Sequence, residues 1–141
     1  MTAKWGRRFY LTGAVVLVLL GLVHSLSLLQ KPVPANPAER ELLTLLSNYK
    51  FRLMGSMRSI NNLFRGFSIT FTVSMIGLGT LDLVLARERA GLLQRVALIN
   101  SIWLAFLTAV SLRYFFIAPT SVLAAALLLF VLSWLTLRRE G

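Results

Sequence analysis

The chain has no cysteine and only one histidine among its 141 residues. The lack of cysteine excludes disulfides, thiolate-ligated zinc, iron–sulfur clusters and thiol catalysis. Acidic residues are also scarce, with 5 Asp and Glu against 15 Lys and Arg. The sequence has no metalloprotease, phosphate-loop or catalytic-triad pattern. It therefore offers few groups for hydrolysis, metal chemistry or proton-coupled transport.

Apolar residues are in excess and lie in long blocks. The chain is 57% hydrophobic and 14% charged, whereas a soluble domain is nearer half apolar and a quarter charged. Each block has about 20 residues, enough for a helix to cross a hydrocarbon core of ~30 Å, and barrel strands would be half as long. We expect spanning helices at residues 9–29, 67–86, 92–112 and 114–137.

The pattern predicts an all-α fold, a four-helix transmembrane bundle forming one integral membrane domain over residues 1–141. The first block has the length of a span rather than of a signal-peptide core, so we expect it to remain in the protein. Trp5, Phe9 and Tyr10 are expected at one membrane interface. The connection at residues 87–91 is short, which predicts that the second and third spans are antiparallel neighbours.

The connection between the first two spans carries helix signals of its own. Asn36 is a good N-cap, Pro37 suits the first helical position, and Glu39 stands at the third. A second amphipathic pattern follows at spacings of four, three and four, formed by Leu53, Met57, Ile60 and Phe64. We expect an interfacial amphipathic helical insertion over residues 37–65, as one helix or as two separated at Gly55.

The net charge of +10 is carried by residues that flank the apolar blocks. Contact with anionic lipid headgroups explains this placement better than nucleic acid does, because no polar domain is left to carry a basic patch. The short basic segments favour an orientation with both termini cytoplasmic, although the long connection is basic as well.

His24 lies near the end of the first apolar block, where an ionisable side chain is a candidate for function. A neutral imidazole could instead make one interhelical hydrogen bond, and a single histidine could ligate haem only across a dimer. Side chains predicted at its depth are those of Ser68, Thr108, Ser111 and Tyr114.

The segment at residues 55–67 is the most polar stretch close to a span. Arg58 stands four residues before Asn62, and Asn61 stands four before Arg65, which would form adjacent rows on a helix. These side chains could bind a phosphate, a carboxylate or a carbonyl, or could simply face headgroups and solvent. Because His24 is predicted at the same membrane side, we take His24, Arg58, Asn61, Asn62 and Arg65 as the candidate ligand site.

Two opposite charges are predicted at similar depth on the second and third spans. Asp82 and Arg95 would form a structural polar pair that fixes this helical hairpin, with Gln94 and Asn100 extending it. On the second span, the segment "GLGT" at residues 77–80 offers small residues for close helix approach.

Two motifs resemble a family of small uncharacterised bacterial four-span membrane proteins. They are "GLVHSL" at residues 21–26 and "FRLMGSMRSINNLFRGFSI" at residues 51–69, and the matching positions are Gly55, Ser56, Arg58, Ser59, Gly66 and Phe67. The resemblance implies the topology, a bacterial inner membrane, and a pairing of His24 with the Arg58 segment. This chain departs from the family's pattern at "NNLFR", and the family implies no chemistry.

Two functions fit these features. The first is a non-enzymatic subunit or accessory protein that packs against other membrane proteins or itself and binds lipid or a lipophilic cofactor such as a pigment or quinone. The second is a membrane enzyme or carrier for a lipid-like substrate, with His24 and the Arg58–Arg65 segment as the polar end of its pocket.

Overall fold

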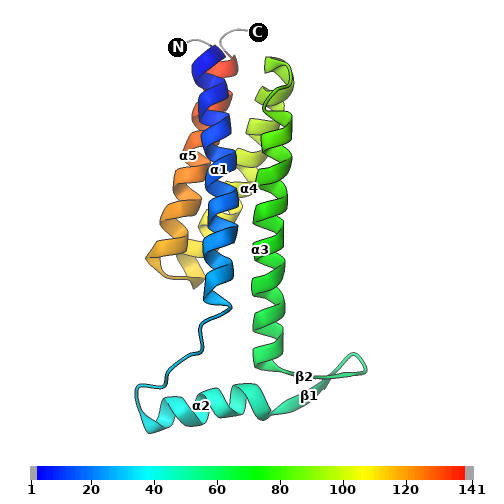
Figure 1. Cartoon of the computed structure of the whole chain (residues 1–141), viewed down its shortest axis with the longest axis vertical. Coiled ribbons are helices and arrows are strands. Elements are labelled where there is room, and N and C mark those ends of the chain that lie inside the picture. The colour runs from blue at the N-terminus through cyan, green and yellow to red at the C-terminus, as the bar shows by residue number, and fades with distance from the viewer. Residues whose placement is uncertain (1–2, 139–141) are drawn as a thin grey trace.

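The computed structural model describes residues 3–138 and confirms the all-α four-helix bundle. Within these residues, four helices are long and apolar enough to cross a membrane. The protein therefore has the character of a multi-pass membrane protein. The elements in chain order (Figure 1) are α1 (Ala3–Ser27), α2 (Pro37–Asn48), β1 (Lys50–Leu53), β2 (Ser56–Ser59), α3 (Ile60–Leu85), α4 (Ala90–Tyr114) and α5 (Ile117–Arg138).

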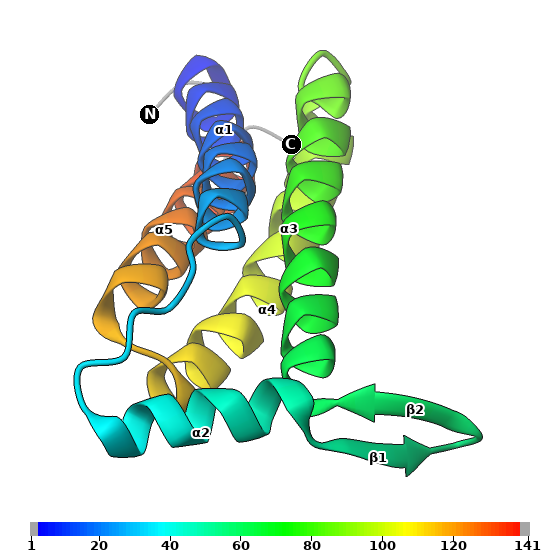
Figure 2. The same cartoon turned by 60° about the horizontal axis from the view of Figure 1, so that its bottom comes forward.

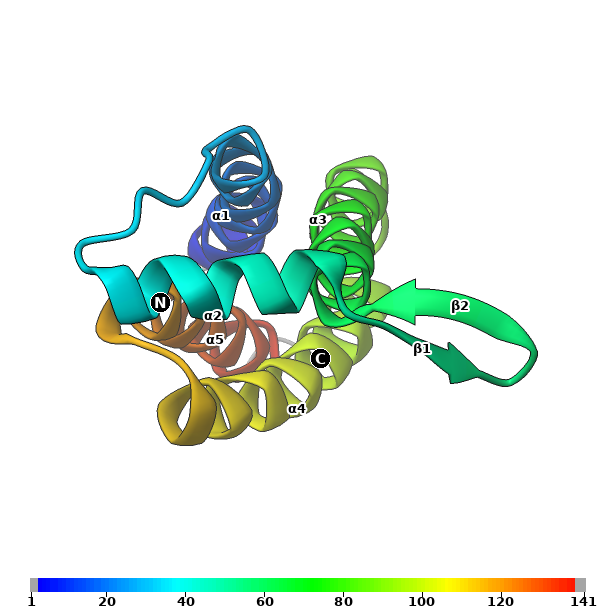
Figure 3. The same cartoon turned by 90° about the horizontal axis from the view of Figure 1, so that it is seen from below.

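The packing order of the long helices differs from their chain order. α1 packs against both α3 and α5, and α5 packs against α4. α3 and α4 are antiparallel, as their short connection predicts, but they make few close backbone contacts within the described chain. Figures 2 and 3 show the reason: α4 slants away from α3 towards α5 as it leaves the turn. The prediction that α3 and α4 are close neighbours is therefore wrong over most of their length.

Two glycines allow α1 and α3 to approach closely. A Cβ atom on Gly79 would lie 2.8 Å from the backbone oxygen of Ala14, and one on Gly21 would lie 3.0 Å from the backbone oxygen of Thr72. Any larger residue would push the backbones apart. The predicted role of small residues on the second span is thus confirmed for Gly79, whereas Gly77 faces open space.

The insertion between α1 and α3 contains only one of the two amphipathic helices that its pattern allowed. α2 lies across the end of the bundle (Figure 3). It begins as predicted, because the side chain of Asn36 accepts a hydrogen bond of 2.9 Å from the backbone N–H of Glu39. Its leucines give it an apolar face, yet none of its residues is buried.

The first half of the second amphipathic stretch, with Leu53 and Met57, forms an antiparallel β-hairpin rather than a helix, whereas Ile60 and Phe64 belong to α3. Lys50 pairs with Ser59, and Leu53 pairs with Ser56. The two turn residues, Met54 and Gly55, have φ values of 46° and 86°, the left-handed conformation that two-residue hairpin turns require. Gly55 therefore reverses the chain instead of separating two helices. α3 also begins at Ile60 rather than at residue 67.

Candidate functional site

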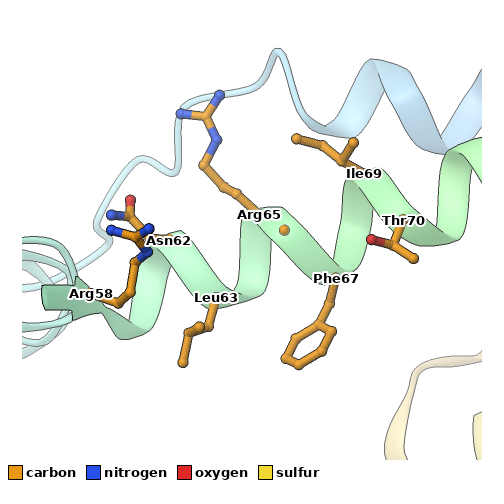
Figure 4. Close-up of a pocket in the computed structure, with 8 residues that line it drawn as sticks. Arg58, Asn62, Leu63, Arg65, Phe67, Ile69 and Thr70 are labelled. Carbon is orange, nitrogen blue, oxygen red and sulfur yellow. The ribbon is translucent and has the colours of Figure 1, made fainter. Parts of the chain in front are cut away.

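A shallow hollow surrounds the first turns of α3, at the end of the bundle where α2 lies. Its volume is about 630 Å³. Two arginines, one amide and one hydroxyl supply its polar side-chain groups, and apolar side chains supply most of the remainder (Figure 4). The lining residues are Arg58, Asn62, Leu63, Arg65, Gly66, Phe67, Ile69 and Thr70.

The hairpin and a helix cap fix the positions of these polar groups. Arg58 is the next-to-last residue of β2, and Ser59 caps α3 by accepting a hydrogen bond of 3.3 Å from the backbone N–H of Asn62. Figure 4 shows Arg58 and Asn62 at the same end of the hollow, beside the start of α3. Arg65 follows on the next turn of α3, so two cations border one hollow.

The cations of the hollow are free to meet an anion. Arg58 and Arg65 are both exposed, and neither forms an ion pair with a residue of the described chain. Within residues 3–138, the Arg58 guanidinium donates a hydrogen bond only to the backbone oxygen of Met57, over 3.1 Å. Gly66 also leaves room, because a Cβ atom there would meet nothing within 4 Å. The hollow can therefore hold an anionic group beside an apolar one.

Two of the five predicted site residues do not line this hollow. Asn61 lies on the side of α3 that faces α2, and its amide donates to the Ser47 hydroxyl over 3.4 Å. His24 lies near the same end of the bundle but packs edge-on against Phe71, with ring centroids 5.0 Å apart. Its Nε2 is buried and has no hydrogen-bond partner within the described chain. The structure therefore groups Arg58, Asn62 and Arg65, and it separates His24 and Asn61 from them.

A buried carboxylate lies near the opposite end of the bundle. Asp82 is only 1% exposed. Its Oδ1 accepts a hydrogen bond of 2.6 Å from the Tyr10 hydroxyl, and its Oδ2 accepts one of 2.8 Å from the Asn100 amide. The predicted extension to Asn100 is confirmed. The expected partner Arg95 is exposed instead, and it forms no ion pair with Asp82.

Tyr10 was expected at the membrane interface, and the structure buries it completely. Its ring also packs edge-on against Phe130, with centroids 5.5 Å apart. The sequence contained a signal for this position. Tyr10, Ala14, Leu17 and Gly21 follow helical spacings of four, three and four, and all four are buried in one face of α1.

A second hollow lies between α3 and α4, where these helices diverge. Its volume is about 290 Å³, and its surface is almost entirely apolar. Met75 and Asn100 are its buried residues. The amide of Asn100 contributes little polarity to the surface because it donates to Asp82. The lining residues are Ser74, Met75, Leu78, Ile99, Asn100 and Trp103.

Comparisons with protein-family models, with curated proteins and with solved structures give no match to this chain. The resemblance of the segments at residues 21–26 and 51–69 to small bacterial four-span proteins therefore stays a prediction.

Proposed function

We propose that this protein is a non-enzymatic accessory protein of a bacterial inner membrane that binds an anionic lipid headgroup at Arg58, Asn62 and Arg65. The observation that carries the proposal is the pairing of two free arginines with apolar side chains in one open hollow at the start of a span. A phosphate group can accept hydrogen bonds from both guanidinium groups and from the amide.

The depth of the hollow suits a headgroup. Membrane-spanning helices place arginines and aromatic rings where hydrocarbon meets polar headgroups. Arg58 and Arg65 lie at the start of α3, and the adjacent Phe67 is 71% exposed. α2 would lie flat in the same plane, with its leucines towards the acyl chains. These features support a position of α2 and the start of α3 at the membrane–water interface.

The accessory role is supported by the apolar outer surfaces of the spans. Large side chains such as Val73, Phe106 and Leu128 are more than half exposed, so they face lipid or another membrane protein. Transmembrane helices associate in lipid through close packing rather than through apolar burial alone, and these outer surfaces can pack closely against another membrane protein. For orientation, we propose that the end carrying Arg7, Arg8 and Arg87 is cytoplasmic, as the positive-inside rule favours.

Native mass spectrometry with defined lipids tests the headgroup site. The protein in detergent receives equal amounts of phosphatidylglycerol and phosphatidylcholine with identical chains, and the retained lipid is identified. We expect retention of phosphatidylglycerol, and a loss of affinity of about 30-fold in the double variant Arg58→Ala/Arg65→Ala, from ~1 kcal/mol per arginine. The control Lys50→Ala/Arg52→Ala removes two charges from the neighbouring strand outside the hollow and should retain the lipid.

Three results would count against the proposal. Equal loss in both double variants would mean a general charge effect. Retention of both lipids alike would mean that the anionic headgroup is not recognised. Binding of added inorganic phosphate without any lipid preference would assign the hollow to a soluble anion. Spectra of protein extracted from its own membranes test the accessory role, which requires other protein chains at a fixed stoichiometry.

A further inference from the structure

Part of the first hollow lies on the same row of α3 as the groove between α3 and α4, whereas Arg65 and Ile69 project from the other side of the helix (Figure 4). Leu63, Phe67 and Thr70 line the hollow at the start of α3, and Ser74 and Leu78 line the groove between α3 and α4. These five positions follow spacings of four, three, four and four. Residues with such spacings form one continuous row along a helix. The groove therefore lies along the same row of α3, beyond the apolar part of the first hollow.

The length of this row matches one leaflet of a bilayer. Leu78 follows Phe67 by 11 residues, which corresponds to ~16 Å along a helix. Half of a hydrocarbon core measures ~15 Å. A chain that starts beside Phe67 would thus reach the level of Leu78 near the middle of the bilayer.

The groove is open because each of its walls packs elsewhere. α3 is held against α1 at Gly21 and Gly79. α4 is held against α5, where the Ser111 and Thr120 hydroxyls are 2.7 Å apart. The Asn100–Asp82 hydrogen bond connects α3 and α4 near the turn, and the helices diverge beyond it (Figure 2). An unfilled groove would lose van der Waals contacts along both walls.

We propose that the groove between α3 and α4 holds an acyl chain of the same anionic lipid whose headgroup binds Arg58, Asn62 and Arg65. This inference depends on the proposed headgroup site, and it adds the ligand class: a long-chain anionic lipid. The two exposed arginines supply the charge complementarity. The shared row on α3 directs one chain into the groove, where Met75 forms the floor and Ile99 and Trp103 form the α4 wall.

Trp103 provides a direct readout, because it lines the groove and is 52% exposed. The double replacement Trp5→Phe/Trp134→Phe leaves it as the only tryptophan of the chain. This protein is reconstituted in vesicles that contain phosphatidylglycerol or phosphatidylcholine, each brominated near the end of one chain. Bromine quenches a neighbouring indole. We expect phosphatidylglycerol to quench Trp103 more strongly than phosphatidylcholine does at the same mole fraction.

The variant Ser74→Phe blocks the groove and leaves the arginines untouched. Ser74 is exposed on α3, so the added ring can occupy the groove without entering the bundle core. The control Val73→Phe adds a ring at the adjacent position, which is exposed and does not line the groove. We expect Ser74→Phe to remove the preference for brominated phosphatidylglycerol and Val73→Phe to keep it. Ser74→Phe should also weaken the affinity for long-chain phosphatidylglycerol by about tenfold, because a few methylene groups of the lipid chain would no longer be buried. The affinity for a short-chain analogue should stay unchanged.

The failure of this inference can be told apart from failure of the headgroup site. If Arg58→Ala/Arg65→Ala loses the lipid while Ser74→Phe keeps both retention and preferential quenching, the headgroup site is correct and the groove assignment is wrong. If Ser74→Phe loses the lipid while the arginine variant keeps it, the groove holds a chain whose headgroup does not depend on the arginines, and the inference is overturned. If both variants keep the lipid, the proposed function and the inference are both wrong.

Discussion

The hydroxyl of Tyr10 on α1 donates a hydrogen bond of 2.6 Å to Oδ1 of Asp82 on α3. Both residues are fully or almost fully buried. Asn100 on α4 donates to the other carboxylate oxygen, so one side chain connects three helices. Burying a carboxylate destabilises the folded state unless its oxygens accept hydrogen bonds. Removing either donor leaves one buried oxygen without a partner and lowers the free energy of unfolding.

Tyr10→Phe should therefore lower the free energy of unfolding by about 1–3 kcal/mol, because it removes one donor and keeps the ring against Phe130. Thermal or SDS-induced unfolding in mixed micelles measures this change. The matched control is Tyr114→Phe, since Tyr114 is 75% exposed and its variant should unfold like the unaltered protein. Equal unfolding of the two variants would show that the Tyr10 hydroxyl contributes nothing.

The partners of Asp82 predict different effects for two residues of α4. Asn100→Leu should destabilise the protein by about 1–3 kcal/mol, because Oδ2 of Asp82 loses its donor. Arg95→Ala should change stability by less than about 0.5 kcal/mol, as exposed substitutions usually do. The same unfolding assay compares them. A larger loss of stability in Arg95→Ala than in Asn100→Leu would instead support the Asp82–Arg95 ion pair that the sequence predicted.

The features that could be predicted from the sequence are those that depend on local patterns of residues. Long apolar blocks revealed the four spans, and Asn36 followed by Pro37 and Glu39 revealed the start of α2. The hairpin was missed because residues 53–64 have apolar positions at helical spacing. The left-handed turn at Met54 has no comparable signal in composition, since an unbranched side chain rarely adopts positive φ.

The partners of buried residues depend on how the helices are placed, and this is not a local property. Asp82 and Arg95 stand on consecutive helices joined by a short turn, which made an ion pair plausible. The actual neighbours arise because α4 slants towards α5 and α1 lies beside α3. The spacing of Arg58, Asn62 and Arg65 suggested adjacent rows on one helix, but Arg58 lies on β2 and only Asn62 and Arg65 lie on α3. The groove beside Trp103 could not be predicted from spacing, because it depends on where α4 is placed.

Gly79 of α3 is buried and Gly77 is exposed, so these two positions provide a matched test of helix packing. Gly79→Ala should destabilise the bundle by about 1–3 kcal/mol, because its Cβ atom would lie 2.8 Å from the backbone oxygen of Ala14 and overpacked interfaces lose this much. Gly77→Ala, two residues away on the same helix, meets nothing within 4 Å and should be neutral or slightly stabilising. Unfolding curves of the two variants that coincide would contradict the close approach of α1 and α3.

Gly66→Leu should fill the headgroup hollow without disturbing the fold. A side chain at Gly66 meets no neighbouring atom within 4 Å, and leucine favours a helix more than glycine does. Stability should therefore be kept or raised, while retention of phosphatidylglycerol falls because the added isobutyl group occupies the space between Asn62 and Thr70. Gly77→Leu adds the same group at another open position of α3, outside both hollows, and should keep the lipid. Retention by Gly66→Leu equal to that of Gly77→Leu, in protein that unfolds normally, would show that the lipid binds elsewhere.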